Sequence, residues 1–169
     1  STDQLGGPPH KFPGMSISVI PLRPKSRGQL TLSSADIDTP PRIYLPYLEN
    51  ADDMSLALKG IDLARRIASQ SALRPWLTSE IFPGPEKTGV ASLEAFARQQ
   101  ATTIFHPVGT CRMGTGKSSV VDSRMKVRGI ECLRVVDASI MPNITSGNTN
   151  APTYALAERA SLILKKDLQ

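Results

Sequence analysis

Alternation of apolar and polar residues marks the first part of the chain as β-type. Residues 15–22 alternate over five positions, and residues 29–33 alternate again around Leu30 and Leu32, after a polar turn at 23–28. A period of two predicts strands with one buried face, and the short turn predicts that these two strands pair antiparallel. Residues 42–48 predict a further short strand, which Pro46 confines to a sheet edge or ends.

The hydrophobic period changes to that of a helix near residue 50. Asn50 or Asp52 is a suitable N-cap for a helix over 52–69. Its apolar stripe comprises Met54, Leu58, Ile61, Ala64 and Ala68. A second helix is predicted over 92–102, with Ser92 as its cap. We expect both to be scaffold helices that pack beside the sheet.

The C-terminal third predicts one buried strand and one helix. Residues 131–137 form the most apolar extended run there, and Pro152 suits the first turn of a helix over 152–166. The predicted inner face of this helix comprises Tyr154, Ala157, Ala160 and Leu164. The predicted fold class is α+β: an antiparallel sheet flanked by helices, with strand 133–137 and the last helix standing apart from that sheet.

Composition is that of an ordinary soluble globular protein, with 40% hydrophobic and 21% charged residues among 169. No apolar run approaches the ~20 residues of a transmembrane segment. The net charge of +5 comes from scattered basic residues without interleaved aromatic side chains, so we expect no nucleic-acid partner. We expect no metal site. A chain that opens at Ser1 with a Gly–Pro run is expected to be a piece of a longer protein.

The two cysteines, Cys111 and Cys132, form neither a CxxC pair nor a disulfide framework. We interpret both as thiols of a protein in a cytoplasmic or other reducing compartment, with a single bridge left open as an alternative.

Candidate chemistry concentrates at residues 105–114, Phe-His-Pro-Val-Gly-Thr-Cys-Arg-Met-Gly. Pro107 biases His106 toward an extended backbone, and Gly109 permits a positive φ or close backbone approach. Histidine suits proton transfer because imidazoles titrate near neutral pH. Local chemistry alone still favours a structural histidine whose hydrogen bonds are satisfied.

Three motifs occur in fixed order: residues 106–114, residues 120–139 with Leu-Arg-Val-Val-Asp-Ala-Ser at their end, and residues 141–153 with Ser-Gly-Asn-Thr-Asn-Ala-Pro-Thr. Together with Arg-Pro-Lys-Ser-Arg-Gly at 23–28, this set resembles the C-terminal region of the glucose–methanol–choline (GMC) oxidoreductases over most of residues 15–166. Residues 1–14, which lack periodicity and contain a Gly–Pro run, are predicted to be a linker or arm. The resemblance implies a substrate-binding domain with the catalytic loop at 15–114. It also implies that residues 115–169 complete an FAD-binding domain.

The same resemblance implies specific roles for seven residues. His106 is the expected acid/base, and Asn148 is expected to hold the substrate oxygen. The expected cofactor-binding residues are Asp137, Ala138, Thr149, Asn150 and Thr153. Without the resemblance, the residues themselves favour a polar turn residue at Asn148 and a strand-end cap at Asp137.

The implied function is oxidation of the CH–OH group of a small-molecule alcohol, with hydride transfer to N5 of FAD. No G-x-G-x-x-G fingerprint occurs in the chain, and Gly116-Lys117-Ser118 lacks the spacing of a phosphate-binding loop. We therefore expect FAD to be held mostly by an N-terminal dinucleotide-binding part of the same protein, the expected partner of this chain. Two alternatives remain open: a flavin-dependent lyase or light-driven decarboxylase of the same fold, or a non-catalytic structural or interaction domain.

Overall fold

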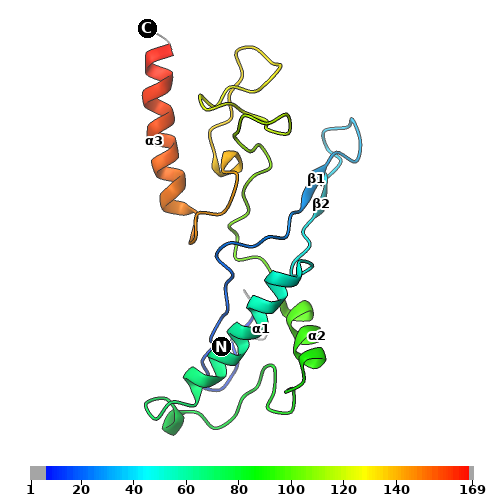
Figure 1. Ribbon diagram of the computed structural model, residues 1–169, viewed down its shortest axis with the longest axis vertical. Helices are drawn as coiled ribbons and strands as arrows, with labels where there is room; N and C mark the ends of the chain where they lie inside the picture. Colours follow the sequence, from blue (N-terminus) through cyan, green and yellow to red (C-terminus); the bar gives the residue numbers. More distant parts are fainter. Residues whose placement is uncertain (1–6, 168–169) are drawn as a thin grey trace. The chain divides into compact units, whose positions relative to one another are not determined.

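The computed structural model describes residues 7–167, and its chain forms two compact units. The first unit combines the described part of 1–28 with 45–102, and the second combines 29–44 with the described part of 103–169. Helices and a small antiparallel sheet make up the regular structure (Figure 1), which confirms the coarse α+β prediction.

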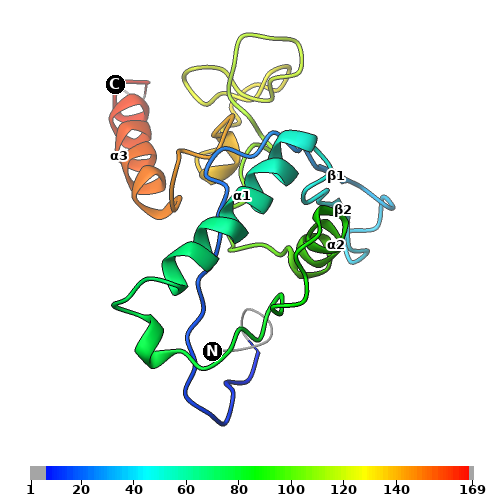
Figure 2. The same ribbon diagram turned by 60° about the horizontal axis from the view of Figure 1, so that its bottom comes forward.

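Helix α1 (Ala51–Ala68) dominates the first unit and matches the predicted helix closely. Asn50 is its N-cap, with the side-chain oxygen accepting the Asp52 N–H at 2.9 Å. Met54 is buried, and the rest of the predicted stripe is half-buried. Helix α2 (Val90–Gln100) packs against α1, and both views show the two side by side (Figures 1 and 2).

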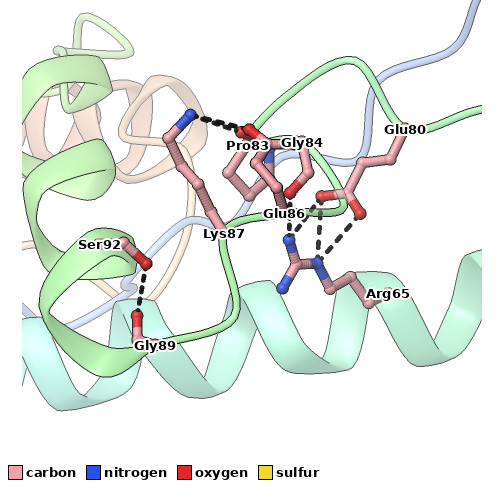
Figure 3. Close-up of polar contacts among 8 residues, drawn as sticks. All are labelled: Arg65, Glu80, Pro83, Gly84, Glu86, Lys87, Gly89 and Ser92. Carbon is pink, nitrogen blue, oxygen red and sulfur yellow. Dashed lines mark hydrogen bonds and ion pairs between the residues drawn. The ribbon is translucent and has the colours of Figure 1, made fainter.

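The predicted cap of α2 was wrong by three residues. Gly89, with an extended backbone, occupies the N-cap position, and Ser92 lies inside the first turn. The Ser92 hydroxyl donates to the Gly89 carbonyl at 2.8 Å (Figure 3). The hydroxyl therefore bonds backward to a carbonyl instead of accepting from the free N–H groups of the turn.

A buried carboxylate fixes the polar turn at 23–28 to the start of α1. Asp53 is 4% exposed and accepts hydrogen bonds from the Lys25 N–H at 2.8 Å, the Ser26 N–H at 2.7 Å and the Ser26 hydroxyl at 2.6 Å. Because a buried charge needs such partners, this cradle sets the path of the chain into α1.

The segment 15–22 is not a strand, which corrects the predicted pairing with 29–33. Within the described residues it has no ladder partner and runs as an extended segment. Val19 packs where Gly60 of α1 has no side chain, since a Cβ on Gly60 would lie 2.2 Å from a Val19 methyl. Apolar alternation therefore reflects packing on a helix here.

The sheet instead consists of β1 (Gln29–Thr31) and β2 (Arg42–Tyr44) in the second unit. They pair antiparallel, with Leu30 opposite Ile43. The turn between them is closed by local bonds, among them the Ser33 hydroxyl to the Pro40 carbonyl at 3.0 Å. The predicted strand at 42–48 is thus confirmed in its first half, and it ends before Pro46 as expected from the missing N–H.

The predicted buried strand at 131–137 is absent from the described structure. One isolated antiparallel bridge joins Lys126 to Arg134, and Glu131, Cys132 and Leu133 are exposed. The core of this unit is instead built from Val121, Met125, Ile140 and Ala160, each at most 3% exposed. Short loops, rather than a sheet, therefore bury its apolar side chains.

Helix α3 (Asn150–Asp167) begins two residues before the predicted helix and uses a different inner face. Leu156, Ala160 and Ile163 pack into the core, whereas Tyr154 is 74% exposed. Ion pairs from Arg124 and Arg134 to Asp167 hold its C-terminal end. Among residues 7–167, no helix has the length and apolar character needed to cross a bilayer.

Candidate active site

Residues 105–114, the histidine loop, are held in place by backbone hydrogen bonds to the segment 139–141. The Cys111 N–H donates to the Ser139 carbonyl at 3.0 Å, and the Met113 N–H donates to the Ile140 carbonyl at 2.8 Å. Gly109 has φ +92°, and a Cβ there would lie 3.4 Å from the Met141 carbonyl oxygen. Glycine thus permits both the backbone conformation and the close approach.

The support beneath this loop is well packed. Ile140 is 1% exposed and lies in the core with Val121, while Cys111 and Met113 of the loop pack against the same cluster. Because the loop and segment 139–141 share one packed base, the position of His106 is fixed by the core. Cys111 and Cys132 are free thiols, as predicted from their spacing in the sequence.

The His106 ring meets the residue that directly precedes α3. Its Nδ1 lies 2.9 Å from the Thr149 hydroxyl and 3.4 Å from the Thr149 backbone nitrogen, whose N–H points at it. Thr149 is 7% exposed and His106 is half-buried. Phe105 is 75% exposed, so it does not enclose the ring as a packing neighbour of a structural histidine would.

Asn148 directly precedes Thr149 in the third sequence motif. The contact between Thr149 and His106 therefore brings the first and third motifs together. Asn148 is exposed, and within the described part of the chain no hydrogen bond joins it to His106. The 43-residue separation of His106 and Thr149 is bridged directly by their side chains.

The other site residues predicted from sequence lie at the two ends of the segment 137–153. Asp137 caps the 3₁₀ turn η2 (Ala138–Ile140) by accepting the Ser139 N–H at 2.7 Å. Thr153 donates its N–H at 3.0 Å and its hydroxyl at 2.7 Å to the Thr149 carbonyl. Asn150 is exposed as the first residue of α3.

Electrostatics at this end of α3 favour an anionic group. Among the described residues of its first turn there is no acidic side chain, while Lys165 and Lys166 lie in its last turn. The first N–H groups of a helix lack intrahelical partners and carry the positive end of its dipole. Apart from α3, one further polar group stands out. The Ser139 hydroxyl, close to Asp137 in the sequence, is buried and has no hydrogen-bond partner among the residues that the structure describes.

The contact between Thr149 and His106 was not predicted. Thr149 was expected to contact a cofactor, and in the structure both its hydroxyl and its N–H are directed to the histidine. No local pattern signals this pair, because the two residues belong to loops that meet only in the folded chain.

The chain resembles known oxidoreductases both in sequence and in structure. A sequence model described as GMC oxidoreductase matches residues 24–157. The chain is 44% identical over 151 residues to an alcohol dehydrogenase [acceptor] of Pseudomonas putida, covering 89% of this chain and 27% of that protein. It is 42% identical over 146 residues to an oxygen-dependent choline dehydrogenase of Proteus mirabilis, covering 86% of this chain and 26% of that protein.

Among solved structures, pyridoxine 4-oxidase from Mesorbium loti superposes with a TM-score of 0.78 at 33% identity, over 83% of this chain and 27% of that one. The chain therefore spans about a quarter of the length of the relatives it matches.

Proposed function

The chain belongs to the GMC oxidoreductase family, and from this we propose that the protein containing it is an FAD-dependent oxidoreductase acting on the CH–OH group of an alcohol. The observation that carries the proposal is the placement of His106. It sits on a rigid loop, half-buried, against the residue that follows Asn148 and precedes α3.

His106 is the proposed acid/base. Its Nδ1 contacts Thr149, so Nε2 is the nitrogen left for substrate. In alcohol oxidation the hydroxyl proton passes to this nitrogen while the carbon loses a hydride. Proton transfer by a positioned side chain contributes on the order of 10²–10⁴-fold to a rate.

Asn148 is proposed to hold the substrate oxygen. Its amide is exposed on the loop that carries Thr149 to His106, and an amide donates a hydrogen bond without taking up a proton. It thus orients the alcohol without competing for the proton.

The residues around α3 fit a flavin. An N-terminal turn without acidic side chains suits an electron-rich polar ring that becomes anionic on reduction. The residues proposed to contact it are Asp137, Ala138, Thr149, Asn150 and Thr153. When bound, FAD supplies the hydride acceptor that no side chain of this chain provides.

The greater part of FAD is proposed to be held by a dinucleotide-binding part of the same protein outside this chain. Two facts support this: the chain has no G-x-G-x-x-G fingerprint, and it spans about a quarter of its relatives.

The test is His106→Ala in the full-length protein, with anaerobic flavin reduction followed at 450 nm using primary alcohols and choline as probes. We expect the limiting rate to fall by roughly 10²-fold or more while bound FAD is retained. The matched control is His10→Ala, which removes the other histidine of the chain and leaves the rate unchanged. Normal reduction by His106→Ala contradicts the assignment, and loss of both FAD and fold indicates a structural histidine.

A further inference from the structure

The Nδ1 atom of His106 has two contacts with the same residue, and they differ in what they permit. The Thr149 hydroxyl lies 2.9 Å away, and the Thr149 backbone nitrogen lies 3.4 Å away. A hydroxyl either donates or accepts, whereas a backbone N–H only donates. The two groups therefore favour different protonation states of the ring.

Distance decides which contact dominates. The hydroxyl contact falls in the usual hydrogen-bond range, and the N–H contact exceeds the roughly 2.7–3.2 Å typical of N–H donors. With the hydroxyl in place, Nδ1 can keep a proton and donate it to Oγ1. Without the hydroxyl, the remaining N–H favours a bare Nδ1, which puts the proton of a neutral ring on Nε2.

We propose that Thr149 is a positioning residue whose hydroxyl accepts the Nδ1 proton and so keeps Nε2 free to take the alcohol proton; this rests on the function proposed above. A neutral imidazole carries one proton, and the nitrogen that bears it is set by the partner of the other nitrogen. After the alcohol proton reaches Nε2, the imidazolium bears a proton on both nitrogens. Among the hydrogen bonds of the described residues, the Thr149 hydroxyl is the acceptor available to Nδ1.

The surroundings of Thr149 hold its hydroxyl toward the ring. Thr149 is 7% exposed, and its carbonyl accepts two hydrogen bonds from Thr153 in the first turn of α3. Since α3 is itself packed through Ala160 and tied at its far end to Arg124 and Arg134, the Thr149 backbone has a firm base.

The test compares Thr149→Val, which keeps the shape and removes the hydroxyl, with Thr149→Ser, which keeps the hydroxyl. In the full-length holoprotein we expect Val to lower the limiting rate of flavin reduction at saturating alcohol about 10- to 100-fold, the range found for partners that orient metal-bound histidines. Ser should stay within about threefold of the unchanged protein. Thr115→Val makes the same change at an exposed threonine outside the histidine loop and should have no effect.

A second readout reports the proton position directly. In protein labelled with [¹⁵N]histidine, assigned with His106→Ala, the neutral His106 ring should carry its proton on Nδ1. It should move to Nε2 in Thr149→Val and return to Nδ1 in Thr149→Ser. If Thr149→Val does not hold FAD, Thr149→Ala removes the hydroxyl without a branched side chain and must show the same proton shift and rate loss.

The outcomes separate this inference from the function beneath it. If His106→Ala lowers the limiting rate of flavin reduction and Thr149→Val does not, the proposed role of Thr149 is overturned and the function of His106 stands. A normal His106→Ala overturns the acid/base assignment as well. An unchanged proton position in Thr149→Val, or equal rate losses in Val and Ser, shows that Thr149 acts only through packing and overturns the inference.

Discussion

At the scale of single residues, Asp53 is the best-defined charged group of the first unit. Burial by itself raises the pKa of its carboxyl, but hydrogen bonds from Lys25 and Ser26 and the charge of Arg27 reverse this and hold the pKa below its ordinary value. The folded state therefore stabilises the ionised Asp53 carboxylate more than the unfolded chain does. Asp53 also joins the turn at 23–28 to α1, so its charge state bears on the path of the chain.

Asp53→Asn in the full-length protein should lower the free energy of unfolding by about 1–3 kcal/mol at pH 7, because it replaces a buried charged acceptor facing three donors. Because the pKa of Asp53 is lower in the folded state, its ionised carboxyl contributes fully to the free energy of unfolding above the unfolded pKa of about 3.9. This contribution is lost as the pH falls through the folded pKa. Urea unfolding followed by circular dichroism at pH 7 and near pH 3 checks this. Asp52→Asn, at the exposed neighbour, is the control and should cost at most about 1 kcal/mol. Equal losses for the two variants would contradict the role of the cradle.

The sequence was sufficient to predict which loops form the candidate site. His106 stands out through the adjacent Pro107 and the ordered motifs, and Gly109 adopts the positive φ that its identity permits. The partner of His106 was not predictable, because Thr149 lies 43 residues away and hydrogen bonding between side chains depends on how two loops meet.

At the scale of elements, the helices and the two strands of the β1–β2 hairpin were predictable, and the other two predicted strands were wrong. The signals for α1, an apolar stripe and an Asn50 cap, lie within the helix itself, so sequence reveals them. A strand exists only with a partner. Residues 15–22 have the same alternation as β-type sequence but pack on α1 near Gly60, and residues 133–137 contribute a single bridge. Tertiary packing thus overrode the local pattern in both segments.

Helix α1 also organises the loop that follows it, through Arg65. Figure 3 shows its guanidinium between Glu80 and the Gly84 carbonyl, with Nε 3.1 Å from each carboxylate oxygen and Nη2 2.9 Å from the carbonyl. Both charged side chains are more than 70% covered, since their exposed fractions are 27% and 28%. These hydrogen bonds of the Arg65 guanidinium, the Arg65 fork, are the main polar contacts between α1 and residues 80–84 in the part of the chain that the structure describes.

Arg65→Ala should therefore lower the free energy of unfolding by about 1–2 kcal/mol and speed proteolysis within the loop at 80–87, because it removes hydrogen bonds to a carboxylate and a carbonyl together. Limited proteolysis of the full-length protein and its urea midpoint measure the two effects. Arg66→Ala, at the next and exposed position of α1, is the matched control. If both variants are cut at the same rate, the fork does not hold the loop.

At the scale of the whole molecule, this chain exposes many large apolar side chains. The most exposed large apolar side chains are Leu32, Ile37, Trp76 and Phe105, each between 75% and 95% exposed. Exposed apolar surface suits contact with other protein. We propose that the remaining part of the protein covers much of it, in keeping with relatives roughly four times as long.

The same reasoning predicts how the chain behaves by itself. Residues 1–169 expressed alone should not retain FAD through gel filtration, because the pyrophosphate of a dinucleotide is bound by a glycine-rich turn and helix N-terminus that this sequence lacks. Absorbance at 450 nm relative to 280 nm gives the bound fraction, and circular dichroism establishes that the isolated chain keeps its helices. The full-length protein, run in the same buffer, should elute with close to one FAD per chain. Stoichiometric yellow colour on the folded isolated chain would show instead that the residues around Asp137 and α3 suffice to hold the cofactor. The proposed division of FAD binding between the two parts would then be wrong.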